Sequence, residues 1–335
     1  MISHQAIVAS SEGACPAMST HISIAHEPTS VHTRRGGPVE PVLGSATSAD
    51  GTTIGYRRFG RGPGLVLLHG SMSSGAHHTD LARFLADSFT LYVPDRRGRG
   101  LTGPYLGRDP LAEELEDLSA LLEATGTSNV WGLSSGAVIA LHAARTTPAI
   151  TKVALFEPPL FRDQAHPAAI LARFDEEMAR GKIGEAMVTA MRGAEMGPGW
   201  MRALPKPLLA RLVAMGMAQE ARKPAGPYPT MRELAATLHA DFAIVAMSSG
   251  PLDARAIGAD TLLMGGSKSP AFLKRALGDL TAALPSARRV ELEGLDHAAS
   301  WNSDVGGHPE LVAPELRRFF TSDGLPEPSD RSIAD

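Results

Sequence analysis

A short segment in the middle of the chain strongly limits the folds that are open to it. Residues 129–131 have the apolar character of a short strand, the pattern Gly-x-Ser-x-Gly follows at residues 132–136, and an apolar helical run begins at once. Small residues two positions before and after Ser134 allow a turn tight enough to lift its hydroxyl above the edge of a sheet. The Gly-x-Ser-x-Gly pattern is informative because a predicted strand precedes it and a predicted helix follows it. It predicts a strand–turn–helix unit that presents Ser134 as a nucleophile.

Strand and helix patterns alternate on both sides of this unit. Continuous apolar runs such as residues 65–68 are typical of strands buried on both faces. The predicted strands are 52–59, 65–68, 89–93, 129–131, 152–156, 261–264 and 289–292, and the helices outside the turn unit are 81–85, 111–124, 271–284 and 309–320. The acidic residues of helix 111–124 (Glu113, Glu114, Glu116 and Asp117) are expected on its exposed side. The alternation predicts a mostly parallel, doubly wound α/β sheet, with site residues where the strands end.

The strand patterns stop between about residues 158 and 256. Four helical segments replace them, at residues 168–179, 184–192, 206–217 and 231–247. We interpret residues 158–256 as a helical cap inserted into a core of residues 41–157 and 257–322. Methionine is frequent in the cap, and flexible thioethers suit an apolar pocket, although core packing explains most of them.

The ends and the overall composition exclude several classes of function. Residues 1–40 and 323–335 lack periodicity, and we expect disordered or flexible tails there. A net charge of -4 gives no reason to expect nucleic acid or an anionic membrane as a partner. The only cysteine, Cys15, excludes internal disulfides and thiol catalysis. No apolar run is long enough for a membrane helix or a secretory signal, so we expect a cytoplasmic protein. No metal site is predicted, because the histidines of the N-terminal tail are irregularly spaced and have no cluster of carboxylates near them.

A serine hydroxyl becomes an effective nucleophile only when a base lies within hydrogen-bond distance. His297 follows the last predicted strand on a glycine-containing loop, where an imidazole can reach the serine turn. His142 lies inside the helix after the turn, His239 in the cap and His308 in a later loop. We therefore favour His297 as the base.

An acyl-transfer intermediate also needs two hydrogen-bond donors for its oxyanion. The Ser135 N–H opens a helix and can supply one of them. The other is expected from the loop after strand 65–68, at the Ser71 N–H. His69 in this loop is expected to act as a structural hydrogen-bonding residue and not as a second base. The candidates for lining a pocket are His69, Met72, His77 and Ser269. For His77 a position on a surface helix is an equal alternative.

The motifs together resemble the α/β-hydrolase superfamily. The resemblance depends on His69-Gly70, on Asp95-x-Arg97-Gly98-x-Gly100, on the Gly-x-Ser-x-Gly turn and on the late His297, in that order, and it covers residues 45 to 320. It implies a Ser–acid–His site under a lid, with no cofactor. It does not specify the substrate.

The chain departs from the superfamily pattern at the acid. The resemblance places the acid in the turn after the next-to-last strand, but this chain has Ser269 at that position. Some members take the acid instead from the end of the strand after the serine turn, where Glu157 stands before two prolines. We favour Glu157 over a site without an acid. Asp296 ranks lower because it is adjacent to His297, and Asp95 is expected to brace the turn before Arg97.

The leading hypothesis is a serine hydrolase that cleaves an ester or a related activated acyl bond of a small, largely apolar molecule. A serine nucleophile in place of aspartate disfavours the alkyl-enzyme chemistry of haloalkane dehalogenases and epoxide hydrolases. C–C bond hydrolysis stays open, as does a biosynthetic lyase, cyclase or acyltransferase, in which the same pocket moves protons without water. A binding protein or inactive scaffold conflicts with the presence of both Ser134 and His297. The sequence does not predict an oligomeric state.

Overall fold

The computed structural model describes residues 40–197, 201, 203–250 and 257–322. The predicted tails lie outside these ranges except for residue 40, and Cys15 lies outside them as well. Within these residues eight strands form one sheet in the order β1-β2-β4-β3-β5-β6-β7-β8. The strands are β1 Val42–Thr47, β2 Thr53–Gly60, β3 Gly64–Leu68, β4 Thr90–Pro94, β5 Asn129–Leu133, β6 Lys152–Phe156, β7 Asp260–Gly266 and β8 Arg288–Leu292.

In sheet order the strands from β4 to β8 are all parallel, and β2, which pairs antiparallel with both β1 and β4, is the one strand of this sheet that runs in the opposite direction. The predicted α/β fold class is therefore confirmed. The register places the end of β5 beside the ends of β3 and β6, since Gly132 is opposite Leu68 on one side and Leu155 on the other. The loops that follow these three strands consequently meet at one edge of the sheet.

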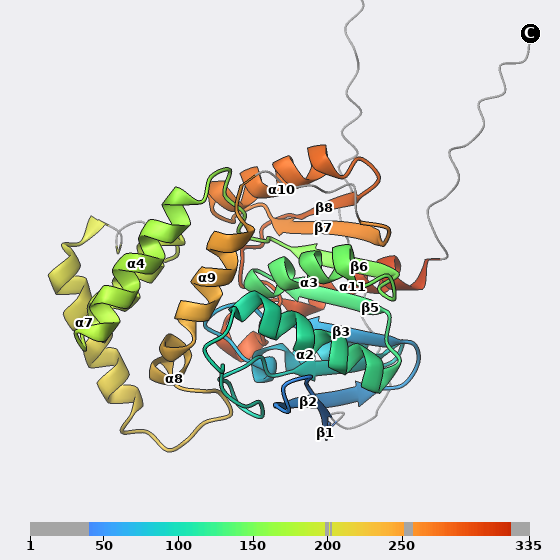
Figure 1. The fold of residues 1–335 in the computed structure, drawn as a ribbon, viewed down its shortest axis with the longest axis horizontal. Helices are drawn as coiled ribbons and strands as arrows, with labels where there is room; N and C mark the ends of the chain where they lie inside the picture. Colours follow the sequence, from blue (N-terminus) through green and yellow to red (C-terminus); the bar gives the residue numbers. More distant parts are fainter. Residues whose placement is uncertain (1–39, 198–200, 202, 251–256, 323–335) are drawn as a thin grey trace, which may run out of the picture. The chain divides into compact units, whose positions relative to one another are not determined.

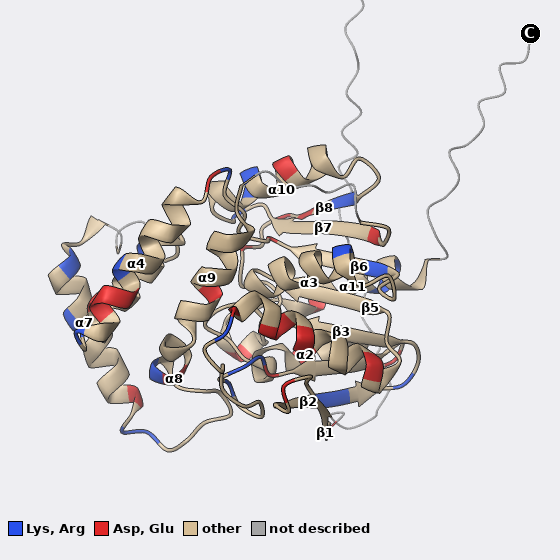
Figure 2. Cartoon of the chain, viewed as in Figure 1, with Lys and Arg blue, Asp and Glu red and all other residues tan. Residues whose placement is uncertain are grey.

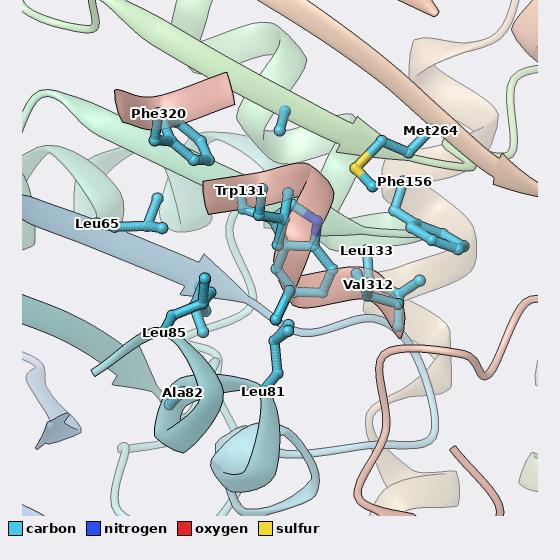
Figure 3. Close-up of a cluster of buried hydrophobic side chains, with 14 of the residues drawn as sticks. Leu65, Leu81, Ala82, Leu85, Trp131, Leu133, Phe156, Met264, Val312 and Phe320 are labelled. Carbon is cyan, nitrogen blue, oxygen red and sulfur yellow. The ribbon is translucent and has the colours of Figure 1, made fainter. Parts of the chain in front are cut away.

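Helices cover both faces of the sheet (Figure 1). These helices are η1 Gly75–His78, α1 Thr79–Leu85, α2 Pro110–Thr125, α3 Ser135–Thr146, α10 Ala271–Ala283, η3 Ser303–Val305 and α11 Pro309–Thr321. Apolar residues of α2, α3 and α10 share one buried cluster with the sheet, and those of α1 and α11 share another. Figure 3 shows the second cluster, in which Trp131 of β5 lies between Leu81 of α1 and Val312 of α11. The strand before the serine turn is thus fixed by buried packing on both faces.

Between β6 and β7 the structure describes the bounds of five further helices, and we call these the inserted helices. They are α4 Ala165–Ala179, α5 Ile183–Gly193, α7 Lys206–Glu220, α8 Met231–Ala236 and α9 Leu238–Ser248. Helix α9 packs against α2 and α3 of the core and against α4, and Figure 1 shows α9 between α4 and the sheet. No helix of the described ranges is both long and apolar enough to span a membrane. The boundaries of the predicted cap remain a prediction.

The structure corrects two predictions about secondary structure. The single helix predicted at residues 231–247 is wrong, because α8 ends at Ala236. The hydroxyl of the next residue, Thr237, donates to the carbonyl of Leu234 at 2.8 Å and competes with the helical pattern. Strand β1 has no counterpart in the prediction. It is a largely exposed edge strand, and its sequence Val-Leu-Gly-Ser-Ala-Thr lacks the alternation that marks a half-buried strand.

A third correction concerns the acidic side of α2, where Asp and Glu residues appear in red in Figure 2. The expectation that its acidic residues are exposed is wrong for Glu113, Glu114 and Asp117, which are buried, whereas Glu116 is partly exposed. The three buried carboxylates are tolerated because arginines neutralise their charge. Arg97, itself fully buried, contacts both Asp117 oxygens at 2.7 Å and Glu113 at 3.1 Å. Charged groups are otherwise rarely buried in this way.

Candidate active site

Ser134 lies at the turn between β5 and α3 in a strained backbone conformation, with φ 55° and ψ −123°. The flanking glycines are required by close backbone contacts. A Cβ on Gly132 would lie 2.4 Å from the carbonyl oxygen of Gly136, and a Cβ on Gly136 would lie 2.4 Å from that of His69. Ser134 is partly exposed while both neighbouring residues are buried. The turn therefore presents one hydroxyl to solvent at the edge of the sheet.

Glu157 and His297 are in direct contact. Glu157 directly follows β6, is fully buried and has a positive φ of 49°. One carboxylate oxygen, Oε1, accepts from the Gly266 N–H at 2.7 Å, and the other, Oε2, lies 2.6 Å from Nδ1 of His297. The His297 ring thus donates from Nδ1 to Glu157, which leaves Nε2 free to accept a proton.

Neither Ser269, at the usual place of the acid, nor the lower-ranked acid Asp296 hydrogen-bonds to the His297 ring among the described residues. Ser269 is buried, and its hydroxyl has no hydrogen-bond partner within the ranges that the structure describes. Asp296 is exposed and accepts from the N–H of Ala298 at 2.9 Å. Asp95 braces a turn as expected, since it accepts from the N–H groups of Gly75 and Leu101 at 2.7 and 2.8 Å.

Ser134 and Glu157 follow the adjacent strands β5 and β6, whereas His297 follows β8 at the edge of the sheet. The Ser134 N–H donates to the carbonyl of Phe156, the residue before Glu157, at 2.9 Å. In the described residues the Ser134 hydroxyl makes no hydrogen bond to the His297 ring. Such bonds are often long in unliganded enzymes and shorten when substrate binds.

The loop after β3 holds one peptide group in a fixed orientation beside Ser134. His69 is fully buried, and its Nε2 accepts from the Arg96 N–H at 3.0 Å, so its proton is on Nδ1. This Nδ1–H and the Ser73 hydroxyl both donate to the carbonyl of Gly70, at 2.9 and 3.0 Å. In a trans peptide the N–H points opposite to the carbonyl, so the Ser71 N–H is directed away from His69. Gly70 packs on the nucleophile, because an added Cβ would lie 2.9 Å from the Ser134 Cβ.

Neither of the two proposed oxyanion donors makes a hydrogen bond to another group of the described residues. The N–H groups of Ser71 and Ser135 have no acceptor there, and Ser135 is the first residue of α3. His69 stays neutral, because burial and the nearby charges of Arg99 and Arg96 hold its pKa well below the ordinary value. It acts as a hydrogen-bonding support for the loop.

The remaining candidates lie at other places. Met72, with φ 52°, packs against apolar residues of the inserted helices. His77 is buried against Tyr228 and Trp301, with ring centroids 4.4 and 5.6 Å apart, and burial lowers its pKa to about 4. Two of the histidines considered as alternative bases pair with carboxylates: His239 pairs with Asp175, and His308 pairs with Glu310. The third, His142, is partly buried on α3.

A polar cluster behind the serine turn was not predicted. Ser135 donates from its hydroxyl to Asp241 of α9 at 2.9 Å and accepts from Arg96 at 2.9 Å. Arg96 and Arg99 both pair with Asp241. The arginines were visible in the sequence beside the acidic helix, but nothing near residue 241 marks its aspartate as part of a site. It lies 106 positions after Ser135.

A cavity of about 930 Å³ lies between the loop after β4 and the residues that join α7 to α8. Its lining includes Arg99, Ser74, Tyr228 and Leu234 but none of Ser134, Glu157 and His297. No group of three or more His, Cys, Asp or Glu side chains suited to a metal ion occurs in the described ranges.

Comparison with known proteins agrees with this architecture. Residues 65–315 match the model of the alpha/beta hydrolase family. An alpha/beta hydrolase from Sphaerobacter thermophilus is 33% identical, has a TM-score of 0.65, and covers 83% of this chain and all of its own. The pimeloyl-[acyl-carrier protein] methyl ester esterase of Stenotrophomonas maltophilia (strain K279a) is 27% identical over 78% of this chain and 95% of its own length.

A third comparison shows the fold alone. A thermophilic esterase from Thermogutta terrifontis has a TM-score of 0.61 at 19% identity, over 84% of this chain and 98% of its own. The predictions of a hydrolase enzyme and of its superfamily are confirmed by these matches together. The chain belongs to the alpha/beta hydrolase family.

Proposed function

We propose that this protein is a serine esterase that acts through an acyl-enzyme. The observation that carries the proposal is the Glu157–His297 contact of 2.6 Å next to the strained turn that presents Ser134. A buried carboxylate on Nδ1 holds the imidazole in the tautomer whose Nε2 can accept the serine proton. This is the arrangement that converts a weak hydroxyl nucleophile into an effective one.

The proposed reaction has two halves. Ser134 Oγ attacks the ester carbonyl carbon while His297 takes the hydroxyl proton, and the oxyanion is stabilised by the N–H groups of Ser71 and Ser135. The C–O bond then breaks, and the alcohol leaves with the proton from His297. Water attacks the acyl-enzyme in the same way, releasing the acid and restoring Ser134.

The substrate is proposed as an ester of a small, largely apolar acyl group, bound beneath the inserted helices, which serve as a cap. Curated relatives from Stenotrophomonas and Xanthomonas are pimeloyl-[acyl-carrier protein] methyl ester esterases, so methyl esters of medium-length acids are the first substrates to test. A cytoplasmic location and the absence of a nucleic-acid partner are kept as proposals from the sequence.

The test is labelling with a fluorophosphonate, which reacts with activated serines. Wild type should label rapidly, Ser134→Ala should not label at all, and His297→Ala should label far more slowly. His308→Ala is the matched control, because that histidine is exposed and paired with Glu310. If wild type hydrolyses no ester and does not label, acyl-enzyme chemistry is refuted, and the non-hydrolytic alternatives become the leading hypotheses.

A further inference from the structure

A buried charge cluster joins one of the inserted helices to the core directly behind the serine turn. Asp241 of α9 is almost fully buried and pairs with Arg99 and, at 2.9 Å, with Arg96. Arg96 also contacts Glu114 of α2 at 2.8 Å. We call Arg96, Arg99, Glu114 and Asp241 the Asp241 cluster. Its two guanidinium groups and two carboxylates balance in charge, as buried charges generally must.

The cluster is connected to both residues whose amides are proposed to bind the oxyanion. The Ser71 hydroxyl donates to that of Ser135 at 3.2 Å, and the Ser135 hydroxyl donates to Asp241 at 2.9 Å. Arg96 reinforces this chain by donating to the Ser135 hydroxyl at 2.9 Å. The hydroxyl chain therefore runs from the partly exposed Ser71 to a fully buried carboxylate.

Arg96 has a second connection to the same loop. Its N–H donates to His69 Nε2 at 3.0 Å, which fixes the ring that holds the Gly70 carbonyl. The Gly70–Ser71 peptide is thus held on its carbonyl side by His69 and at the Ser71 side chain by Ser135. Both routes lead to Arg96, which Asp241 and Glu114 hold in place.

We propose that Asp241 is a positioning residue that fixes the amides of Ser71 and Ser135 for oxyanion binding. It acts through Ser135 and Arg96 and does not touch the substrate. The inference rests on the proposed function and deepens it, because it makes a residue of the inserted helices part of the support for the oxyanion site. Donors held in place before the reaction need no reorganisation when charge develops, which is the source of their effect.

The charge state of Asp241 supports this role. Burial acts to raise its pKa, but Arg99 and Arg96, together with the hydrogen bond from Ser135, hold that pKa below the ordinary value. The group is therefore a carboxylate at neutral pH and can accept from both arginines and from Ser135 at once. An asparagine would keep the size but lose the charge and one acceptor.

The test compares Asp241→Asn and Ser135→Ala with wild type, using ester hydrolysis with the serines counted by fluorophosphonate titration. Loss of an oxyanion donor lowers kcat by about 10²- to 10³-fold, and displacement of a donor should lower it less. We therefore expect kcat per titrated serine to fall about 10- to 100-fold in Asp241→Asn and about 10-fold in Ser135→Ala. KM should change less than about threefold, because the lost interaction is made only in the transition state. The matched control is Asp175→Asn, an exposed aspartate of α4, which should match wild type.

A boronic acid, which forms a tetrahedral anion on the serine, provides the second readout. Its inhibition constant should rise in proportion to the fall in kcat, whereas a merely structural role would reduce only the number of titratable serines. Unchanged kcat per serine and unchanged boronate binding in Ser135→Ala and in folded Asp241→Asn would overturn the inference. If Asp241→Asn fails to fold, Ser135→Ala decides, since it leaves the arginine–carboxylate pairs in place. Failure of the proposed function is distinguishable, because wild type itself would then not label.

Discussion

Replacing Glu157 with glutamine is expected to lower kcat by about 10³- to 10⁴-fold, the size of loss seen when a triad acid becomes an amide. The structure indicates how the amide would sit. Oε1 accepts a hydrogen bond from the Gly266 N–H, so this position requires an oxygen, and the amide nitrogen must take the position of Oε2. That nitrogen would then donate to His297 Nδ1 and force the ring proton onto Nε2. In this tautomer His297 cannot accept the serine proton.

The charge effect gives a similar magnitude. Nδ1 and Oε2 are 2.6 Å apart, and the Glu157 side chain is fully buried. With the two delocalised charges centred about 4 Å apart and an effective dielectric constant of about 20, the attraction that favours the imidazolium is about 4 kcal/mol. Since each 1.36 kcal/mol corresponds to about tenfold in rate, this is roughly a 10³-fold loss, to which the wrong tautomer adds.

The assay is kcat for a p-nitrophenyl ester, divided by the number of serines that a fluorophosphonate labels after prolonged incubation. Ser269→Ala and Asp296→Asn are the matched controls, because Ser269 stands at the usual place of the acid, Asp296 is the lower-ranked acid, and neither side chain hydrogen-bonds to the His297 ring. Both should keep activity within about threefold of wild type, as expected for side chains outside the reaction. Circular dichroism would confirm that Glu157→Gln is folded.

Two results would refute the reasoning. The first is a Glu157→Gln variant that retains more than a tenth of the wild-type kcat, which would show that the carboxylate does not support His297. Alternatively, Ser269→Ala could lose as much activity as Glu157→Gln, which would return the supporting role to the turn after β7.

Three further predictions concern stability. Arg97→Met should lower the free energy of unfolding by about 3–5 kcal/mol in urea titration, because it leaves the buried carboxylate of Asp117 without its arginine partner; a loss below 1 kcal/mol would contradict this. Gly136→Ala should destabilise by about 3 kcal/mol through overpacking, whereas Gly216→Ala, a control in open space on α7, should be neutral or slightly stabilising. Burial lowers the pKa of His78 to about 3, so between pH 6.5 and 3 the unfolded chain binds more protons and stability falls as pH is lowered. Between pH 6.5 and pH 5 the free energy of unfolding should fall by about 2 kcal/mol on account of His78. In His78→Phe the fall measured by urea titration should be smaller by about this amount, and a fall equal to that of wild type would contradict the prediction.

The parts of the fold that the sequence predicted are those determined by neighbours along the chain. Apolar runs such as residues 152–156 need burial on both faces whatever lies next to them, and the serine turn needs small residues at 132 and 136. The observed strand at Lys152–Phe156 has the predicted bounds, and Glu157 lies against His297 as the proposed order of residues requires. The catalytic roles themselves stay a prediction until they are measured.

Two of the failures, the burial of the α2 carboxylates and the role of Asp241, have a common physical cause, which is burial of charge. Whether Glu113 is exposed depends on an arginine 16 positions away, and whether Asp241 is part of a site depends on Arg96, 145 positions away. In the hydrophobic pattern of the sequence Glu113 and Asp241 count only as charged residues, and a charged residue is usually exposed. Only the three-dimensional arrangement shows that these charges neutralise one another.

The segment that carries the inserted helices has its two ends side by side, because the Gly250 N–H, just after α9, donates to the carbonyl of Phe161, just before α4, at 2.8 Å. A segment with adjacent ends can be exchanged between relatives without changing strand order, so natural recombination or a laboratory graft can give this core a different specificity. The charge cluster limits that freedom. An exchanged segment without a carboxylate at the place of Asp241 would leave Arg96 and Arg99 facing Glu114 alone. Compatible donors for a chimera are therefore those that carry an acidic residue on the helix that packs against α3.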